Sequence, residues 1–218
     1  MSGSRSNSIC ECPNKQENRN RVAAEHAEEK MNGNERRNEG LHAEAVRPCA
    51  ELLDAYLDFC RETWGHVHDP YILHDPALYA QWRETIFEDY RRQEAGIGLA
   101  PGIVPSVTYW IRSGDRIIGA ANIRPELNDA LRDYGGHLGL VIRPGERGKG
   151  YGWGILPQLA ELARGLGVRE LLLTCEGSNR ASLRHLESIP GARQESADGV
   201  VNGRRCRIHR TWLKLIGG

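Results

Sequence analysis

The sequence predicts an α/β fold in which a central sheet, mixed but mostly antiparallel and of six to seven strands, carries helices on both faces. Between residues 43 and 213, hydrophobic patterns follow one another as strand, two helices, three strands, helix, strand, helix and two strands. Two turn sequences, Ser113-Gly114-Asp115 and Asn202-Gly203, are typical of hairpins between neighbouring strands. A glycine-rich turn connects the strand over residues 137–143 to a helix.

The N-terminal part of this fold is predicted to contain one strand and two helices. Residues 43–47 form a short strand, and Pro48 opens a helix. Asp75-Pro76 combines an N-cap with a proline and begins the second helix, after a loop over residues 65–74. The apolar faces are Leu53, Leu57, Cys60 and Trp64 in the first helix, and Leu78, Trp82, Ile86 and Tyr90 in the second.

The remaining elements follow from β-rich runs separated by glycine and proline. Strands over residues 105–113 and 116–124 form the first hairpin, and residues 128–136 are a polar loop. After the strand over 137–143 come a helix over 150–166, a strand over 168–175 and a helix over 179–188. Strands over 192–200 and 204–213 complete the sheet.

The 218-residue chain is long enough for one domain with a substantial core, which we predict over residues 42–218. Residues 1–41 are rich in Asn, Glu, Arg, Ser and Gly and contain few large apolar side chains. Such a segment cannot bury enough apolar surface to offset the entropy of ordering it. We therefore predict a disordered polar tail over residues 1–41.

The charge balance and the cysteines exclude several classes of partner. Lys plus Arg and Asp plus Glu number 29 each, so we expect no nucleic acid partner. No apolar run approaches the roughly 18 residues that a membrane-spanning helix needs, so we expect no membrane partner. The scattered cysteines favour reduced thiols in a cytoplasmic protein. Neither Cys10-Glu11-Cys12 nor His66-x-His68 has the further ligands of a metal site, so no metal is expected.

The glycine-rich turn is predicted to bind a phosphate. Gly148, Gly150 and Gly152 leave N–H groups unobstructed at the start of a helix, where the helix dipole favours an anion. A P-loop is excluded because Lys149 is followed by Gly150 rather than by Ser or Thr. The dinucleotide fingerprint is excluded because the glycines alternate up to Gly154 instead of following the Gly-x-Gly-x-x-Gly spacing.

The pattern Arg147-x-x-Gly150-x-Gly152 resembles the pyrophosphate loop of the GCN5-related N-acetyltransferases (GNAT), a family that binds acetyl-CoA. The predicted element order from residue 46 to 213 is similar to the order in that family. The runs 104–110, 119–124 and 135–137 look closest to a bacterial group of uncharacterised acetyltransferases. The resemblance therefore implies acetyl-CoA as co-substrate.

The same resemblance implies which residues contact CoA. The pyrophosphate is held by main-chain N–H groups, and the pantetheine arm pairs with a strand edge that also supplies the oxyanion donor near Val141. Asn179 and Ser182 contact the CoA arm, although Asn179 also fits a plain helix N-cap. The loop residues are Arg147, Gly148, Lys149, Gly150, Tyr151 and Gly152, and the strand residues are Leu140, Val141 and Ile142.

The catalytic residues implied by the resemblance are incomplete. His137 stands where many members place a Glu base, and a histidine is a suitable base near neutral pH. The alternative, a structural histidine with satisfied hydrogen bonds at a strand start, is somewhat favoured. Many members place a Tyr seven residues after the Asn, to protonate the leaving thiolate. Here that position is Leu186, so the general acid stays unassigned, with His185 and Cys175 nearby in the sequence.

The acceptor is expected to be a small molecule with a primary amine, acetylated by direct attack on the thioester. Asn122, Arg124 and Asn128 are candidate acceptor-binding residues because they lie at or after the end of a strand. Two alternatives stay open: a non-catalytic acyl-CoA-binding or sensing module, and an acetyltransferase for protein N-termini or lysines. A homodimer is compatible with the sequence.

Overall fold

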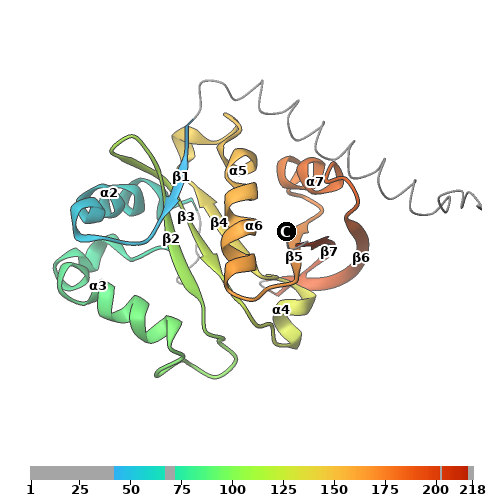
Figure 1. Cartoon of the computed structure of the whole chain (residues 1–218), viewed down its shortest axis with the longest axis horizontal. Coiled ribbons are helices and arrows are strands. Elements are labelled where there is room, and N and C mark those ends of the chain that lie inside the picture. The colour runs from blue at the N-terminus through green and yellow to red at the C-terminus, as the bar shows by residue number, and fades with distance from the viewer. Residues whose placement is uncertain (1–41, 67–71, 202, 216–218) are drawn as a thin grey trace, which may run out of the picture.

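The computed structural model describes residues 42–66, 72–201 and 203–215 (Figure 1). The predicted tail over residues 1–41 lies outside this part of the chain, as do His68 and Asn202. The described residues form seven strands with helices packed against them, which confirms the predicted fold class.

Four strands form the first sheet, in the order β1-β2-β3-β4. All three pairs are antiparallel. Ser113 pairs with Arg116 across the predicted hairpin turn, where Gly114 has a φ of 59°. The strands are β1 (Glu44–Val46), β2 (Val107–Ser113), β3 (Arg116–Ile123) and β4 (Leu138–Ile142).

Three strands form a second sheet, in the order β5-β7-β6, again with antiparallel pairs only. They are β5 (Glu170–Glu176), β6 (Arg193–Val201) and β7 (Arg204–Lys214). Val201 pairs directly with Arg204, and Gly203 has a φ of 76°, as expected for the second predicted hairpin. The number of strands agrees with the prediction, but they are divided between two sheets instead of forming one continuous sheet.

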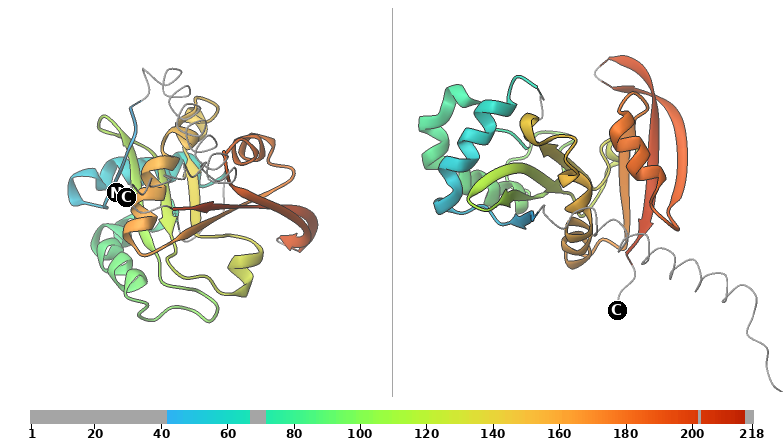
Figure 2. Two further views of the ribbon diagram at one scale, coloured as in Figure 1. Left: turned by 45° about the vertical axis from the view of Figure 1, so that its right-hand side comes forward. Right: turned by 90° about the horizontal axis from the view of Figure 1, so that it is seen from above.

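The two sheets meet where β4 begins and diverge from there (Figure 2, right). His137 donates its N–H to the Leu172 carbonyl at 2.9 Å, and its ring Nδ1 accepts the Leu172 N–H at 2.9 Å. Because this side chain takes the place of a main-chain acceptor, the pairing between the strands ends after one residue. Gly136 has a φ of 61°, and a Cβ there would lie 2.4 Å from the Leu172 carbonyl oxygen, so the junction requires glycine.

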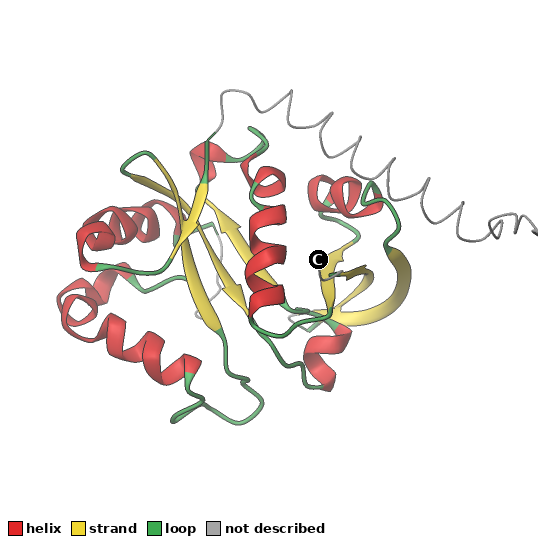
Figure 3. Cartoon of the chain, in the orientation of Figure 1, coloured by secondary structure: helices red, strands yellow, loops and turns green. Residues whose placement is uncertain are grey.

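Helices cover both faces of the first sheet (Figure 3). The helices α2 (Leu53–Thr63) and α3 (Tyr79–Glu94) bury one core against it, in which Tyr56 stacks on Trp110 at 4.3 Å between ring centroids. The opposite core is covered by α5 (Tyr151–Gly154), α6 (Leu156–Gly165) and α7 (Arg180–Glu187). The split between α5 and α6 follows from Pro157, which has no N–H to donate to the carbonyl four residues earlier.

The polar loop predicted over residues 128–136 contains a short helix, α4 (Asp129–Asp133), and the prediction of loop alone is wrong there. Asn128 is its N-cap, since its Oδ1 accepts the Leu131 N–H at 3.0 Å. An Asn followed by Asp is a helix-start signal that the strand-end interpretation of Asn128 overlooked.

Candidate active site

The glycine turn joins β4 to α5 and α6 through backbone conformations that favour glycine. Gly148 has a φ of 75° and Gly150 a φ of 99° with ψ −7°. Gly150 is the N-cap of α5, and its carbonyl accepts hydrogen bonds from Trp153 and Gly154. The helix therefore begins immediately behind the turn, as the glycine spacing predicts.

The N–H groups of residues 148–152 are open. Among the described residues none of them donates a hydrogen bond. The Arg147 N–H, by contrast, donates to the Pro144 carbonyl at 3.2 Å. Consecutive unpaired N–H groups at the start of a helix attract an anion such as a diphosphate. The main-chain site predicted over residues 147–152 is thus available from Gly148 onward.

β4 is the last strand of its sheet: one edge pairs with β3, and no described strand pairs along the other edge. Arg143 N–H donates to the Ile118 carbonyl at 2.8 Å. Since alternate residues of an antiparallel strand direct their main-chain groups to the same side, Val141 is directed toward β3. Leu140 and Ile142 are directed to the open edge, where an amide-containing arm can pair with them. The geometry therefore favours Leu140, and not Val141, as an oxyanion donor.

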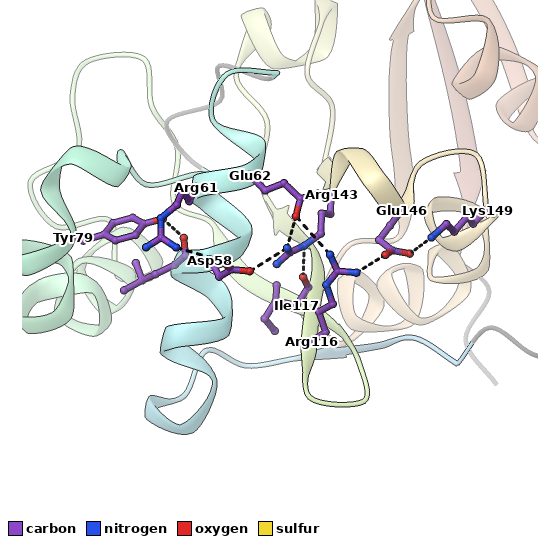
Figure 4. Close-up of polar contacts among 10 residues, drawn as sticks. Asp58, Arg61, Glu62, Tyr79, Arg116, Ile117, Arg143, Glu146 and Lys149 are labelled. Carbon is purple, nitrogen blue, oxygen red and sulfur yellow. Dashed lines mark hydrogen bonds and ion pairs between the residues drawn. The ribbon is translucent and has the colours of Figure 1, made fainter.

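A buried arginine anchors the end of β4 to α2 (Figure 4). Arg143 is 2 % exposed, and its Nε donates to the Ile117 carbonyl at 2.9 Å. Its Nη1 lies 2.5 Å from Glu62 Oε2 and 3.2 Å from Asp58 Oδ2. Because a buried guanidinium needs opposite charge, these two carboxylates hold the start of the turn at a defined position relative to α2.

The chain of charges continues into the glycine turn (Figure 4). Arg116 lies 3.5 Å from Glu62 Oε2 and 2.6 Å from Glu146 Oε1, and the other Glu146 oxygen lies 2.9 Å from Lys149 Nζ. The hydrogen bond from Lys149 lowers the pKa of Glu146, with Arg116 acting in the same direction. The Lys149 ammonium thus has a partner within the protein. Glu146 was not identified from the sequence as a residue of this site. Its position three residues before Lys149 was the signal that could have indicated the ion pair.

The guanidinium of Arg147 is turned toward β4. Its Nε donates to the Ile142 carbonyl at 3.0 Å, across the end of the open edge. The side chain therefore lies between the turn and the strand, where its remaining N–H groups can contact a phosphate.

His137 joins the two sheets and is poorly suited to act as a general base. The side chain is 8 % exposed, and Nδ1 accepts the Leu172 N–H. In the neutral ring Nε2 therefore carries the hydrogen and has no lone pair for a substrate proton. Burial, together with the charges of Arg132 and Arg124, lowers the pKa of His137 to about 4. The geometry supports the alternative of a buried structural histidine.

Asn179 is the N-cap of α7. Its Oδ1 accepts the Ser182 N–H at 3.1 Å, which confirms the capping interpretation. Asn179 is exposed and Ser182 is partly buried, and contact of either with the CoA arm stays a prediction.

The residues near the usual general-acid position do not supply one. Leu186 is a core residue of α7 and is 9 % exposed. Cys175 is buried in β5, and burial raises the pKa of its thiol to about 11. His185 is exposed and stacks on Trp153, with 5.2 Å between the ring centroids. The general acid therefore stays unassigned.

Two of the three predicted acceptor residues lie on the α2–α3 face of the first sheet. Asn122 is fully buried, and its Nδ2 donates to Ser106 Oγ at 2.9 Å. Arg124 donates to the Gly136 carbonyl at 3.1 Å, beside the junction of the two sheets. Asn128 is the cap of α4 and is partly buried. The structure therefore keeps Asn122 and Arg124 together and gives Asn128 a separate structural role.

Residues 42–66, 72–201 and 203–215 contain no group of three His, Cys, Asp or Glu side chains that could hold a metal ion. No helix in the same part of the chain is long and apolar enough to cross a membrane.

Known structures share this fold. A crystal structure of a probable acetyltransferase is 18 % identical, with a TM-score of 0.58, 81 % of this chain covered and 94 % of the other. The putative acetyltransferase yncA from Salmonella typhimurium, solved with acetyl-CoA, is 18 % identical, with a TM-score of 0.51 and coverage of 81 % and 95 %. A spermidine N-acetyltransferase chimera of Vibrio cholerae SpeG and hSSAT is 14 % identical, with a TM-score of 0.50 and coverage of 79 % and 95 %.

The sequence itself gives the family. No curated protein matches it. The model of the acetyltransferase (GNAT) family matches residues 50–188, which is more than half of the chain and includes the glycine turn, β4 and the Asn179 cap. The chain therefore belongs to the GNAT family of acetyltransferases.

Proposed function

We propose that the protein transfers the acetyl group of acetyl-CoA to the primary amine of a small molecule, by direct attack of the amine on the thioester. The observation that carries the proposal is the row of open N–H groups over residues 148–152, next to the open edge of β4. A pyrophosphate at this turn directs the amide-containing arm of CoA along Leu140 and Ile142. One similar structure contains acetyl-CoA, and another is named for the small amine spermidine.

The reaction requires one bond to form and one to break. The amine nitrogen bonds to the carbonyl carbon, the carbon–sulfur bond breaks, the nitrogen loses a proton and the CoA thiolate gains one. The Leu140 N–H at the open edge is suited to stabilise the negative charge on the carbonyl oxygen. Since His137 offers no free lone pair and Leu186 has no proton to give, we assign both proton transfers to water.

A second candidate function has one observation in its favour. Leu186 is buried where many family members have a Tyr, as in an acyl-CoA-binding module that has lost transfer activity. Such a module binds CoA and releases no thiol with any acceptor. A protein acetyltransferase differs from both because it acetylates peptides in preference to free amines.

A thiol-release assay separates these functions. Acetyl-CoA and the protein are incubated with amino acids, polyamines, aminoglycosides and peptides, and each product is identified by mass spectrometry. We expect thiol release that depends on a small primary amine, with one acetyl group added to it. CoA binding by calorimetry without thiol release across the whole panel would contradict the proposal and favour the binding module. Acetylation of peptides alone would favour the protein acetyltransferase.

A further inference from the structure

A cavity of about 530 Å³ lies in the helical layer that covers one face of the first sheet. Its walls come from three segments far apart in the sequence: Trp64 at the end of α2, His74, and the α3 residues Trp82, Asp89 and Gln93. The volume is within the range of small-molecule binding sites. None of these residues belongs to the glycine turn or to the open edge of β4.

His74 lines this cavity and has an unpaired ring nitrogen atom. The side chain is 9 % exposed, and its Nδ1 lies 2.7 Å from the hydroxyl of Tyr56, which donates to the Ile72 carbonyl at 2.9 Å. Because the hydroxyl has a single hydrogen, Nδ1 must be the donor in its bond with Tyr56. The neutral ring then carries a lone pair on Nε2, which has no donor among the described residues. Burial lowers the pKa of His74 to about 4, so the ring is neutral near pH 7.

Asp89 adds an uncompensated negative charge to the same wall. It lies seven residues after Trp82 and four before Gln93, which places the three side chains along one side of α3. The carboxylate forms no hydrogen bond or ion pair with the described residues. It raises the pKa of His74 against the larger effect of burial, as expected for a charge near the ring. A half-buried carboxylate without a partner favours a cationic ligand.

The rest of the lining also suits a cation with a carbon skeleton. The Trp82 and Tyr90 rings lie edge-on to His74, with centroid distances of 4.6 Å and 5.4 Å. Aromatic rings attract organic cations and pack against carbon chains. Asp75 contributes a second carboxylate to the cavity lining. The described residues that line the cavity include neither Lys nor Arg. A ligand with only carboxylate or phosphate groups would meet repulsion here.

Hydrogen bonds link the cavity to β4. Gln93 Nε2 donates to Ser106 Oγ at 2.8 Å, and Ser106 Oγ also accepts from Asn122 Nδ2. Asn122 pairs across the sheet with Gly139 of β4, and its Oδ1 has no donor among the described residues. Since neighbouring strands lie about 4.8 Å apart, β2 and β4 are separated by about 10 Å. A small acceptor molecule can span this distance.

We propose that this cavity binds an ammonium group of the acceptor other than the amine that is acetylated, which reaches the open edge of β4. The acceptor class is then an organic molecule with at least two amino groups on an aliphatic or aromatic skeleton. His74 Nε2 accepts an N–H of the ammonium, the carboxylate of Asp89 supplies the opposite charge, and Trp82 and Tyr90 contact the carbon atoms. This assignment rests on the proposed function, because it concerns the substrate of that reaction.

Calorimetry on the full chain tests the site with two probes of the same shape, phenethylamine and the neutral 2-phenylethanol. Asp89→Asn removes the charge, and His74→Asn removes Nε2 while its amide can still donate to Tyr56. Asp115→Asn removes an equal charge at the exposed turn between β2 and β3 and is the matched control. Thermal unfolding of each variant checks that it is folded.

We expect wild type to bind phenethylamine at least about tenfold more tightly than the alcohol, and Asp89→Asn to abolish this preference. His74→Asn weakens amine binding at least about fivefold, and Asp115→Asn changes nothing. In the thiol-release assay, Asp89→Asn raises KM for the amine and leaves kcat within about threefold.

Four results would overturn parts of the account separately. Equal binding of both probes by wild type, or equal effects of Asp89→Asn and Asp115→Asn, contradicts the ammonium site. Acetylated amines whose KM is unchanged in Asp89→Asn and His74→Asn contradict the site while the proposed function stands. The expected binding pattern without acetylation of any amine contradicts the proposed function and, with it, the role of the cavity in acceptor binding.

Discussion

The glycine turn and the cavity around His74 present different kinds of atoms to a ligand. The turn offers the main-chain N–H groups of residues 148–152, while the Lys149 ammonium is paired within the protein. The cavity offers side-chain atoms, above all the His74 imidazole and the Asp89 carboxylate. In the two proposals, the backbone binds an anion and the side chains bind a cation, on opposite helical layers of one sheet.

The largest effect is expected from Gly150→Val, which tests whether the backbone of the turn is the phosphate site. A β-branched residue does not adopt the φ of 99° at this position, so the turn must rearrange and its N–H groups move. We expect the CoA dissociation constant, measured by calorimetry, to rise at least about 100-fold.

The matched control for this variant is Gly114→Val. Gly114 also has a positive φ, 59°, with open space around it, but lies in the turn between β2 and β3. The Gly114→Val substitution imposes similar backbone strain away from the glycine turn and should leave CoA affinity within about threefold of wild type. Equal losses of affinity in both variants would mean that instability, and not the phosphate site, explains the result.

A smaller effect, on stability, is expected at His137. His137→Ala leaves the buried Leu172 N–H without an acceptor and opens a cavity, so the free energy of unfolding should fall by about 3 kcal/mol in urea denaturation. His137→Asn can place Oδ1 near the former Nδ1 and should lose only about 1 kcal/mol. Thiol release by His137→Asn should stay within about tenfold of wild type. A loss of kcat beyond about 100-fold with intact CoA binding would restore His137 as the general base.

The same residue makes the stability depend on pH. Its pKa is about 4 in the folded chain and about 6.5 in the unfolded chain, so between these values the unfolded chain binds a proton that the folded chain does not. The free energy of unfolding therefore falls as the pH drops from about 6.5 to about 4. His137→Asn should make this slope shallower, and His74, whose pKa is also lowered to about 4, should account for part of what remains. An unchanged slope would contradict the buried neutral histidine.

The smallest effect is expected from Lys149→Met. Because Glu146 already pairs with the ammonium, its removal should raise the CoA dissociation constant only about two- to threefold. A rise above about 30-fold in calorimetry would mean that the side chain, and not the backbone, binds the phosphate.

The features that follow local rules were predicted from the sequence. Glycine spacing indicated the turn, and residues 113–115 and 202–203 indicated the hairpins, because a backbone with positive φ selects a small set of residues. The helices around Leu57 and Ile86 followed from their apolar periodicity.

The features that depend on tertiary contacts were not predicted. The sheet divides because the His137 side chain occupies a main-chain N–H on a strand 35 residues away, which no local pattern shows. The direction of Leu140 and Val141 depends on the register with β3. His74 lies in a loop, as predicted, but its burial was not predicted, because its partner Tyr56 and the cavity residue Asp89 lie on two separate helices.

Amide-resolved NMR of the full chain, titrated with CoA, tests the central claim most directly. We predict that the largest chemical-shift changes fall on the N–H groups of residues 148–152 and of Leu140, with smaller changes at Val141. Shift changes concentrated elsewhere, with the amides of residues 148–152 unmoved at saturating CoA, would contradict a main-chain pyrophosphate site at the glycine turn.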